Sequence, residues 1–205
     1  MQIPAPFPLL KKFIPQINKG VVLDIGAGNG RNSFYLAKNG FRVESIDVNS
    51  QNIQQLKKKS SRLNLGLNIN KFDVRKFKFS TKKYDLILAI QSLIWIRKSE
   101  YLKVIKKIKD SLKIGGVGII SGFTIKDSSY LNLKSIRIPV EKNTFYSKSE
   151  KRFWQFLEPQ ELKKCFSQKD FKILYYKEKL VKDKDCKSSV SYPHLHEIAE
   201  IVVKK

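Results

Sequence analysis

The sequence Val21-Val22-Leu23-Asp24-Ile25-Gly26-Ala27-Gly28-Asn29-Gly30-Arg31 joins a short apolar run to three closely spaced glycines. The apolar part has the length and composition of a buried strand, and the residues from Arg31 to Lys38 have the spacing of a helix that ends at Asn39-Gly40. A glycine turn between a strand and a helix lets a ligand approach backbone N–H groups closely. This unit therefore predicts an α/β domain with a ligand site at its first turn.

Strand and helix patterns continue to alternate as far as residue 122. We predict strands over 41–46, 67–71, 84–90 and 117–121, and helices over 51–62 and 100–112, with Gly115-Gly116 breaking the second of these helices. The run 84–90 is apolar almost throughout, as a central parallel strand buried on both faces requires. A further helix begins near Pro159, and two last strands, 171–180 and 197–203, can pair as an antiparallel hairpin at the sheet edge.

The length and composition of the chain bound its class. At 205 residues and 41% hydrophobic, we expect one domain over 1–205, preceded by a proline-broken N-terminal segment at 1–19. That segment has no signal-peptide pattern, and no apolar run is long enough for a membrane span, so we expect a cytoplasmic protein without membrane contact. Cys165 and Cys186 lie far apart, which gives no case for a disulfide or a metal site. Nothing in the sequence indicates an oligomeric state.

The net charge of +23 would attract a phosphate backbone or an acidic surface. Most of the 41 basic residues are lysines, however, and they are spread from Lys11 to Lys205 among many isoleucines and asparagines, as an AT-rich genome would encode. No patch interleaves basic and aromatic residues in the way that single-strand binders do. We therefore interpret the charge as compositional, so that nucleic acid is a possible partner but not the favoured one.

The segment 123–156 is polar, charged and broken by Pro139, and it is longer than a connection needs to be. We predict an irregular loop or lid on the substrate side of the domain. Within it, Arg137 and Arg152 are candidates for an anion clamp, with a solvated surface as the alternative for both. Trp95, after the fourth strand, and Phe153-Trp154 are candidates for a pocket wall, with core packing as the alternative.

Three aspartates follow successive strands and point to the nature of the ligand. The GxGxG spacing differs from the GxGxxG dinucleotide fingerprint, and Asp24 just before the glycines would repel a pyrophosphate but attract an ammonium group. Asp47 ends the second strand, where a carboxylate can accept hydrogen bonds from both ribose hydroxyls. Asp73 follows the third strand, within reach of an adenine amino group, with a turn residue as the alternative. Together they favour S-adenosylmethionine over NAD.

These motifs carry a family resemblance. The run from Val22 to Ser33, with Asp47, Asp73 and the strand Tyr84-Asp85-Leu86-Ile87, resembles the class I S-adenosylmethionine-dependent methyltransferases. The GNGRNS run, the segment 156–162 and the segment 193–199 are most similar to the tellurite-resistance methyltransferase group. Related proteins often carry His-Phe-Leu where this chain has Ile94-Trp95-Ile96, and many carry Cys where it has Ala27.

The resemblance implies a fold, a cofactor site and a substrate class. It implies a Rossmann-like α/β fold whose seven-stranded sheet is mostly parallel, with the last strand antiparallel and helices on both faces. It also implies a small acceptor that is anionic or a soft nucleophile. The implied cofactor contacts are Asp24, Gly26, Gly28, Asn29, Asp47, Val48, Asp73, Val74, Ala89, Ile90 and Gln91.

The only two histidines are candidates for the acceptor site. His194 and His196 alternate on an expected strand, so both project to the same side, where they could orient an acceptor or take up its proton. A metal half-site or a polar strand face are the alternatives, but no further metal ligands stand out, so we expect no metal.

Three functions were weighed on this basis. The leading hypothesis is methyl transfer to a small acceptor such as tellurite, selenite or a thiol. Its rival is an RNA or protein methyltransferase that uses the basic surface, although the segment Ile90-Gln91-Ser92-Leu93 lacks the Asn/Asp-Pro-Pro-Tyr run of amine methylators. The third is a cofactor-binding regulator without turnover.

Overall fold

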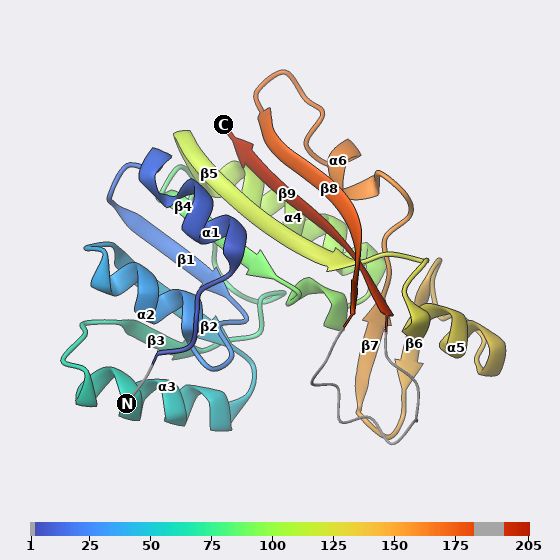
Figure 1. Cartoon of the computed structure of the whole chain (residues 1–205). Coiled ribbons are helices and arrows are strands. Elements are labelled where there is room, and N and C mark those ends of the chain that lie inside the picture. The colour runs from blue at the N-terminus through green and yellow to red at the C-terminus, as the bar shows by residue number, and fades with distance from the viewer. Residues whose placement is uncertain (1–2, 183–194) are drawn as a thin grey trace.

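The computed structural model describes residues 3–182 and 195–205, which build a seven-stranded sheet with the order β3-β2-β1-β4-β5-β9-β8 (Figure 1). The strands are β1 (Val21–Ile25), β2 (Arg42–Asp47), β3 (Asn68–Lys71), β4 (Tyr84–Ile90), β5 (Leu112–Phe123), β8 (Lys172–Lys182) and β9 (Leu195–Lys204). β1, β2, β3, β4 and β5 pair in parallel, and β9 pairs antiparallel with both β5 and β8. This is the mostly parallel seven-stranded sheet, with its last strand antiparallel, that the resemblance implies.

The strand order places a crevice between β1 and β4. β1 pairs in parallel with β2 on one side and with β4 on the other, so the order in which the chain adds strands to the sheet reverses at this point. In open α/β sheets, ligands bind at such a switch point, outside the carboxyl ends of the strands. The glycine turn after Ile25 lies at this edge of the sheet.

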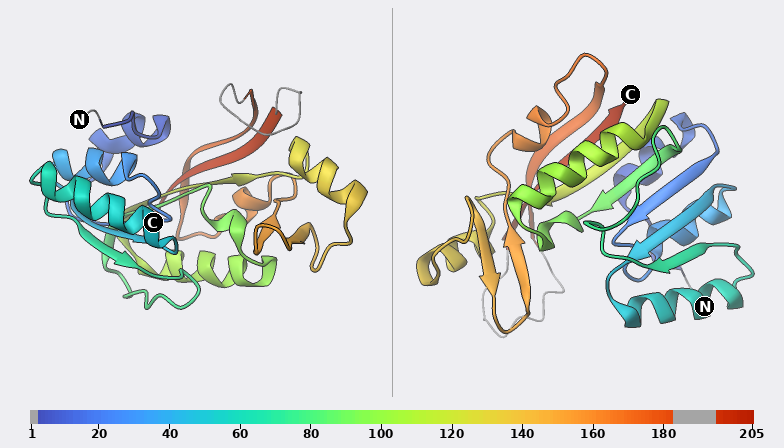
Figure 2. Two further views of the ribbon diagram at one scale, coloured as in Figure 1. Left: turned by 90° about the horizontal axis from the view of Figure 1, so that it is seen from below. Right: turned by 180° about the vertical axis from the view of Figure 1, so that it is seen from behind.

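Helices cover both faces of the sheet (Figure 2). α1 (Pro8–Phe13), a 3-10 helix (Ile14–Gln16), α2 (Arg31–Lys38) and α3 (Ser50–Arg62) lie on one face, and α4 (Lys98–Ser111) and the short α6 (Glu161–Lys164) on the other.

The position of β4, covered on both faces of the sheet, explains why its sequence is apolar throughout. Leu86 and Leu88 pack into the core beneath α1 and α2, while Ile87 and Ala89 pack into the core beneath α4. Because successive residues of a strand point to opposite faces, a strand covered on both sides needs an uninterrupted apolar run.

The prediction of an irregular segment at 123–156 is wrong. It contains α5 (Ser128–Ile136) and a hairpin of β6 (Thr144–Ser147) and β7 (Arg152–Gln155), which lie beyond the carboxyl end of β5 (Figure 1). Tyr130, Phe145 and Phe156 are buried together in one cluster with Ile94 and with Ile198 of β9. The chain therefore buries enough apolar surface here to order the segment.

β5 is also longer than predicted. α4 ends at Ser111 and β5 begins directly at Leu112, so Gly115-Gly116 lies inside the strand and does not break the helix. A Cβ on Gly116 would lie 2.9 Å from the Tyr84 carbonyl oxygen, so glycine allows the two strands to approach at this bend. The helix expected from Pro159 is limited to Glu161–Lys164. Among the residues that the structure describes, no helix is long and apolar enough to cross a membrane.

Candidate functional site

The glycine turn has a backbone that only glycine adopts readily. Gly26 and Gly28 have φ angles of +69° and +54°. The N–H groups of Gly26 and Ala27 both donate to the Ile46 carbonyl oxygen, at 2.8 and 3.0 Å, which holds the turn against the end of β2. A Cβ on Gly26 would lie 2.4 Å from the Ser92 Cβ, whereas a Cβ on Gly28 would meet only the Gly26 carbonyl oxygen, at 3.9 Å. Gly28 therefore borders open space.

A cavity of about 490 Å³ lies in front of this turn. It is bounded by the carboxyl ends of β1, β2 and β4, by the loop after β3 and by β7 of the hairpin. Its volume is within the range of small-molecule and cofactor sites, about 300–1,000 Å³. The lining residues are Ile25, Gly26, Gly28, Ile46, Asp47, Val48, Asn49, Asn52, Phe72, Asp73, Val74, Arg75, Ile90, Gln91, Ser92, Trp95, Ile96, Lys151, Arg152 and Phe153.

Asp47 organises the part of the cavity nearest the turn. Its Oδ2 accepts a hydrogen bond from the Gly28 N–H at 2.9 Å, and its Oδ1 accepts one from the Asn49 N–H at 2.8 Å. The Asn52 side chain donates to Oδ2 at 3.2 Å. Because each carboxylate oxygen can accept two hydrogen bonds, Asp47 keeps capacity for a ligand hydroxyl while it fixes the turn.

Asp24 lies behind the turn and is not among the residues that line the cavity. Its side chain is buried, and its carboxylate accepts a hydrogen bond from the Ser33 hydroxyl at 2.6 Å, which in turn accepts one from the Ser45 hydroxyl at 2.9 Å. Burial raises the pKa of Asp24 to about 6, because the charged form loses its hydration. A cationic ligand group nearby would stabilise the charged form.

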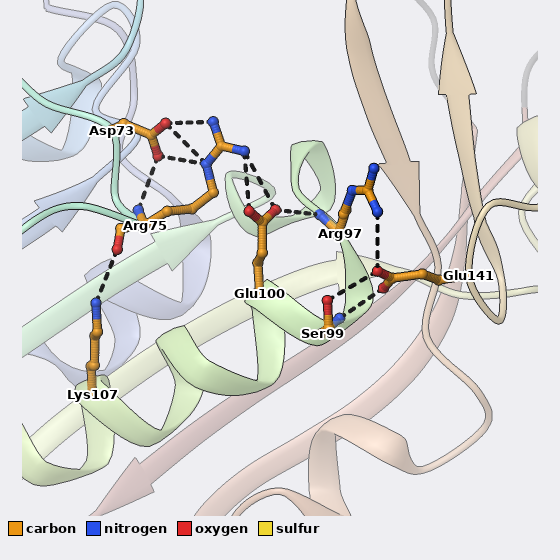
Figure 3. A network of polar contacts seen from close by, with 7 residues as sticks. All are labelled: Asp73, Arg75, Arg97, Ser99, Glu100, Lys107 and Glu141. Atoms are coloured by element: carbon orange, nitrogen blue, oxygen red, sulfur yellow. Dashed lines mark hydrogen bonds and ion pairs between the residues drawn. The ribbon is translucent and has the colours of Figure 1, made fainter.

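Asp73 lines the cavity and belongs to a network of charged groups that Figure 3 shows. Nε of Arg75 lies 2.9 Å from both carboxylate oxygens, and these hydrogen bonds hold the pKa of Asp73 below its usual range. Arg75 also pairs with Glu100 at 3.3 Å, and Glu100 accepts the Arg97 N–H. Asp73 is thus held by a neighbour of its own loop.

Glu141 completes this network from the segment before the hairpin (Figure 3). Its two oxygens accept hydrogen bonds from the N–H and the hydroxyl of Ser99, at 2.9 and 3.0 Å, and Nη1 of Arg97 lies 3.6 Å away. Ser99 is in the first turn of α4, so Glu141 caps that helix from another part of the chain. The network therefore connects the loop after β3 with the 123–156 segment.

Two apolar side chains of the cavity are unusually exposed. Val48 is 65% exposed and Phe72 is 46% exposed, and both line the cavity near Asp47 and Asp73. Exposed apolar surface inside a concave site is typical of a surface that a ligand covers. A flat ring bound here would bury both side chains.

Gln91 and Ser92 form the floor of the cavity after β4. Gln91 has a φ angle of +50°, and its N–H donates to the Ser121 carbonyl oxygen at 3.1 Å. Among the described residues, the buried Ser92 Oγ has no hydrogen-bond partner. Ala89 is fully buried in the core below and does not line the cavity. Asn29 also lies outside it, where its side chain accepts the Arg31 N–H.

The end of the cavity nearest the hairpin is aromatic and cationic. The guanidinium of Arg152 lies over the Trp95 ring, 3.6 Å from its centroid, and 5.3 Å from the centroid of Trp154. The two indole rings meet edge to face with centroids 4.5 Å apart. The guanidinium of Arg97 lies 4.8 Å from the centroid of the Phe153 ring. The structure therefore brings the predicted residues Trp95 and Arg152 together at the cavity.

The other predicted acceptor residues lie elsewhere. His196 Nδ1 lies 2.9 Å from the buried carboxylate of Asp127, and the His196 ring stacks on Phe123 with centroids 4.8 Å apart. Arg137 donates through Nη1 to the Tyr146 carbonyl oxygen. Neither residue lines the cavity, and His194 lies outside the described residues. The structure does not join His196 or Arg137 to the cofactor residues.

Several lining residues were not predicted from the sequence. Asn52, Phe72 and Arg75 lie next to predicted residues, and their only sequence signal is that proximity. Ser92 was not predicted either and directly follows the predicted Gln91, whereas the predicted pocket-wall residue Phe153 reaches the cavity because the 3-10 helix Leu93–Trp95 packs against β7. A contact between segments that lie about sixty residues apart has no signal in a single sequence.

Comparison with known proteins gives the family. The model of the family described as "Tellurite resistance protein TehB" matches residues 10–181. The chain belongs to the TehB family. The resemblance seen in the sequence is thereby confirmed.

Two curated relatives of this TehB family member are named as methyltransferases. A probable S-adenosyl-L-methionine-dependent methyltransferase TehB from Haemophilus influenzae is 30% identical over 99 residues, which are 48% of this chain and 34% of the relative. The ubiquinone biosynthesis O-methyltransferase of Rickettsia akari is 25% identical over 159 residues, 77% of this chain and 61% of the relative. The matches thus span about a third and three fifths of the length of these relatives.

Solved structures support the same fold. The crystal structure of TehB from Haemophilus influenzae superposes with a TM-score of 0.75 at 21% identity, and the match covers 97% of this chain and 62% of the other. A SAM-dependent methyltransferase from Methanosarcina mazei superposes with a TM-score of 0.74 at 18% identity, and the match covers 98% and 99% of the two chains.

Proposed function

We propose that this TehB family member binds S-adenosylmethionine in the cavity and transfers the methyl group to a small acceptor. The observation that carries the proposal is the hydrogen bond from the Gly28 N–H to Asp47 on the cavity wall. It joins a glycine turn after β1 to a carboxylate after β2, which is the pair of features that a nucleoside cofactor uses at a sheet switch point. The family match supports the same cofactor.

The residues present fit this cofactor. Asp47 has acceptor capacity for a ribose hydroxyl, and the exposed side chains of Val48 and Phe72 offer apolar surface to an adenine ring. Asp73 and Val74 also line the cavity, and the Asp73 carboxylate can accept a hydrogen bond from an amino group in addition to those from Arg75. The open space beside Gly28 accommodates a ligand that approaches the backbone closely.

The amino-acid part of the cofactor fits beside the glycine turn. Gly26, Gln91 and Ser92 line the cavity, and the carboxylate of Asp24 lies just behind the turn. A buried carboxylate with a raised pKa is stabilised by an ammonium group, so Asp24 favours a ligand that is cationic at this end.

The chain's own residues act by positioning. When bound, S-adenosylmethionine supplies a methyl group on a sulfonium, which needs little help to leave. The protein therefore gains most by holding the acceptor in line with that methyl group and by keeping water away from it. Trp95, Arg152 and Phe153 close the cavity beside the cofactor residues and are suited to these two tasks.

We propose a chalcogen oxyanion such as tellurite or selenite, a thiol, or a similar small nucleophile as the acceptor. The cationic side chain of Arg152 at the acceptor end favours an anion. The RNA or protein alternative rests on the net charge of +23 alone.

Two measurements test the proposal. Calorimetry with S-adenosylhomocysteine should give saturable binding, whereas NAD should not bind. A coupled assay should then detect S-adenosylhomocysteine release with tellurite, selenite or thiols, and none with bulk RNA at physiological ionic strength. Binding of a nicotinamide nucleotide in place of S-adenosylhomocysteine would refute the cofactor assignment. Turnover with RNA alone would refute the small-acceptor assignment.

A further inference from the structure

The acceptor end of the cavity has more apolar surface than a hydrated inorganic oxyanion needs. Ile90, Ile96, Trp95 and Phe153 line it, and two of these four are aromatic. Aromatic faces gain most from contact with another ring or an apolar surface. An inorganic oxyanion is recognised by hydrogen-bond donors and gains nothing from the ring surface that Arg152, over Trp95, and Arg97, over Phe153, leave uncovered.

The same end of the cavity carries positive charge. Lys151 and Arg152 of the hairpin line it, whereas the two carboxylates that line the cavity are Asp47 at the end of β2 and Asp73 in the loop after β3. Glu150 pairs with Arg152 Nη2 at 2.7 Å but is not itself a lining residue. A ligand that fills this end would therefore meet cations and rings together.

Arg152 is held in a fixed position by its aromatic neighbours. Its guanidinium stacks on Trp95, and Glu150 accepts hydrogen bonds from both Arg152 and the Trp154 indole N–H. Its buried Nε has no hydrogen-bond partner among the described residues. The buried Nε is closed to a ligand, so an anion in the plane of the guanidinium binds through the Nη groups of this partly exposed side chain.

We infer that the acceptor is a flat organic anion, an aromatic ring that carries a carboxylate and a hydroxyl or thiol nucleophile. The ring packs against Trp95 and Phe153, and the carboxylate pairs with Arg152 and Lys151. This inference rests on the proposed function, since it names the acceptor class for the same site. Such an acceptor differs from an inorganic oxyanion because its binding requires the aromatic residues as well as the positive charge.

The chain reports on this site by its own fluorescence. Trp95 and Trp154 are its only tryptophans, and they contact each other beside the cavity. In the presence of saturating S-adenosylhomocysteine, titration with salicylate or thiosalicylate should give a saturable change in tryptophan fluorescence. Benzyl alcohol, which lacks the charge, and acetate and tellurite, which lack the ring, should bind at least about tenfold more weakly.

Variants separate the two parts of the site. Arg152→Gln should weaken thiosalicylate binding by about tenfold or more, the loss expected for one charged hydrogen bond, and leave S-adenosylhomocysteine affinity unchanged. Arg137→Gln is the matched control, since it removes an arginine from the same segment that does not line the cavity. Trp154→Phe leaves Trp95 as the only tryptophan, and the tryptophan response should persist.

The outcomes distinguish this inference from the proposed function. Failure to bind S-adenosylhomocysteine would refute the proposed function. Normal S-adenosylhomocysteine binding, with a fluorescence response to tellurite but none to the aromatic anions, would overturn only the acceptor class. An unchanged thiosalicylate affinity in Arg152→Gln would overturn it as well.

Discussion

The Asp47 carboxylate accepts the backbone N–H of Gly28 at 2.9 Å, and so the end of β2 holds the turn that follows β1. The same carboxylate also accepts the Asn49 N–H in front of α3. One side chain thus fixes the glycine turn and the start of a helix, and it does so at the wall of the cavity. Such fixed geometry reduces the ordering that a ligand must impose when it binds.

Asp47→Ala should weaken S-adenosylhomocysteine binding by about 1.5–3 kcal/mol, because a charged acceptor is lost and the Gly28 N–H loses its partner. Asp47→Asn keeps one acceptor oxygen, so its affinity for S-adenosylhomocysteine should lie between those of Asp47→Ala and the wild type. Titration calorimetry measures both. Asp110→Ala, which removes an exposed aspartate paired with Lys106, is the control and should bind normally. Equal affinities for wild type and Asp47→Ala would remove Asp47 from the site.

The two glycines of the turn should respond differently to alanine. Gly26→Ala places a Cβ 2.4 Å from Ser92 and should lower the free energy of unfolding through both overpacking, about 1–3 kcal/mol, and left-handed strain, about 1–2 kcal/mol. Gly28→Ala should lower the free energy of unfolding through left-handed backbone strain alone, because its Cβ would enter open space. Urea unfolding should therefore rank Gly26→Ala as the less stable variant. The reverse order would contradict the packing described for Ser92.

The sequence predicted the first half of the fold closely because its signals there are local. The strands Val21–Ile25 and Tyr84–Ile90 and the helix Arg31–Lys38 have the predicted bounds, since an apolar run, glycines and a helical period mark each of them. In 123–156, Tyr130, Phe145 and Phe156 are far apart in a polar background and form a core only after the chain folds. No regular spacing in the sequence indicates that core.

The residues of the candidate site also fall into those that local sequence signals mark and those that they do not. Asp47, Gly28 and Asp73 were predicted because strand ends and glycine spacing mark them, and all three line the cavity. Ala89 and Asn29 were carried over by resemblance and do not line it. The stacking of Arg152 on Trp95 depends on the hairpin folding back against the end of β4, which is a tertiary contact.

Asp24 should make the stability of the ligand-free protein depend on pH. Burial raises the pKa of Asp24 from 3.8 to about 6 in the folded protein. The folded protein therefore favours protonated Asp24, and the free energy of unfolding falls as the pH rises from about 4 to about 6. The loss is on the order of 2–3 kcal/mol. Asp24→Asn removes the charge and keeps an acceptor for Ser33, so it should be as stable as wild type near pH 4 and more stable at pH 7.5.

Urea unfolding at several pH values tests this prediction for Asp24. The difference between the variant and the wild type is the quantity to follow, because other carboxylates titrate in both proteins. The same variant should bind S-adenosylhomocysteine more weakly at pH 7.5, since the cationic end of the ligand loses its partner. A difference in unfolding free energy that does not change between pH 4 and pH 7.5 would show that Asp24 is not the group responsible.

Glu141 should anchor the 123–156 segment to the first turn of α4. Its carboxylate accepts the Ser99 N–H, and this hydrogen bond holds the pKa of Glu141 below its usual range, so the contact is present at neutral pH and is lost as the pH falls through that lowered pKa. Glu141→Ala removes a helix cap and should lower the free energy of unfolding at pH 7 by about 0.5–2 kcal/mol. Glu141→Gln keeps the acceptor and should lose less.

Hydrogen exchange shows whether the effect of Glu141 is local. In Glu141→Ala, amides of β6 and β7 should exchange faster, while those of β1 and β4 should change only as far as global stability falls. Because Arg152 and Phe153 lie on β7, the variant should also weaken binding at the acceptor end of the cavity more than S-adenosylhomocysteine binding. Unchanged exchange in the hairpin would mean that its contacts with the 3-10 helix Leu93–Trp95 hold it without Glu141.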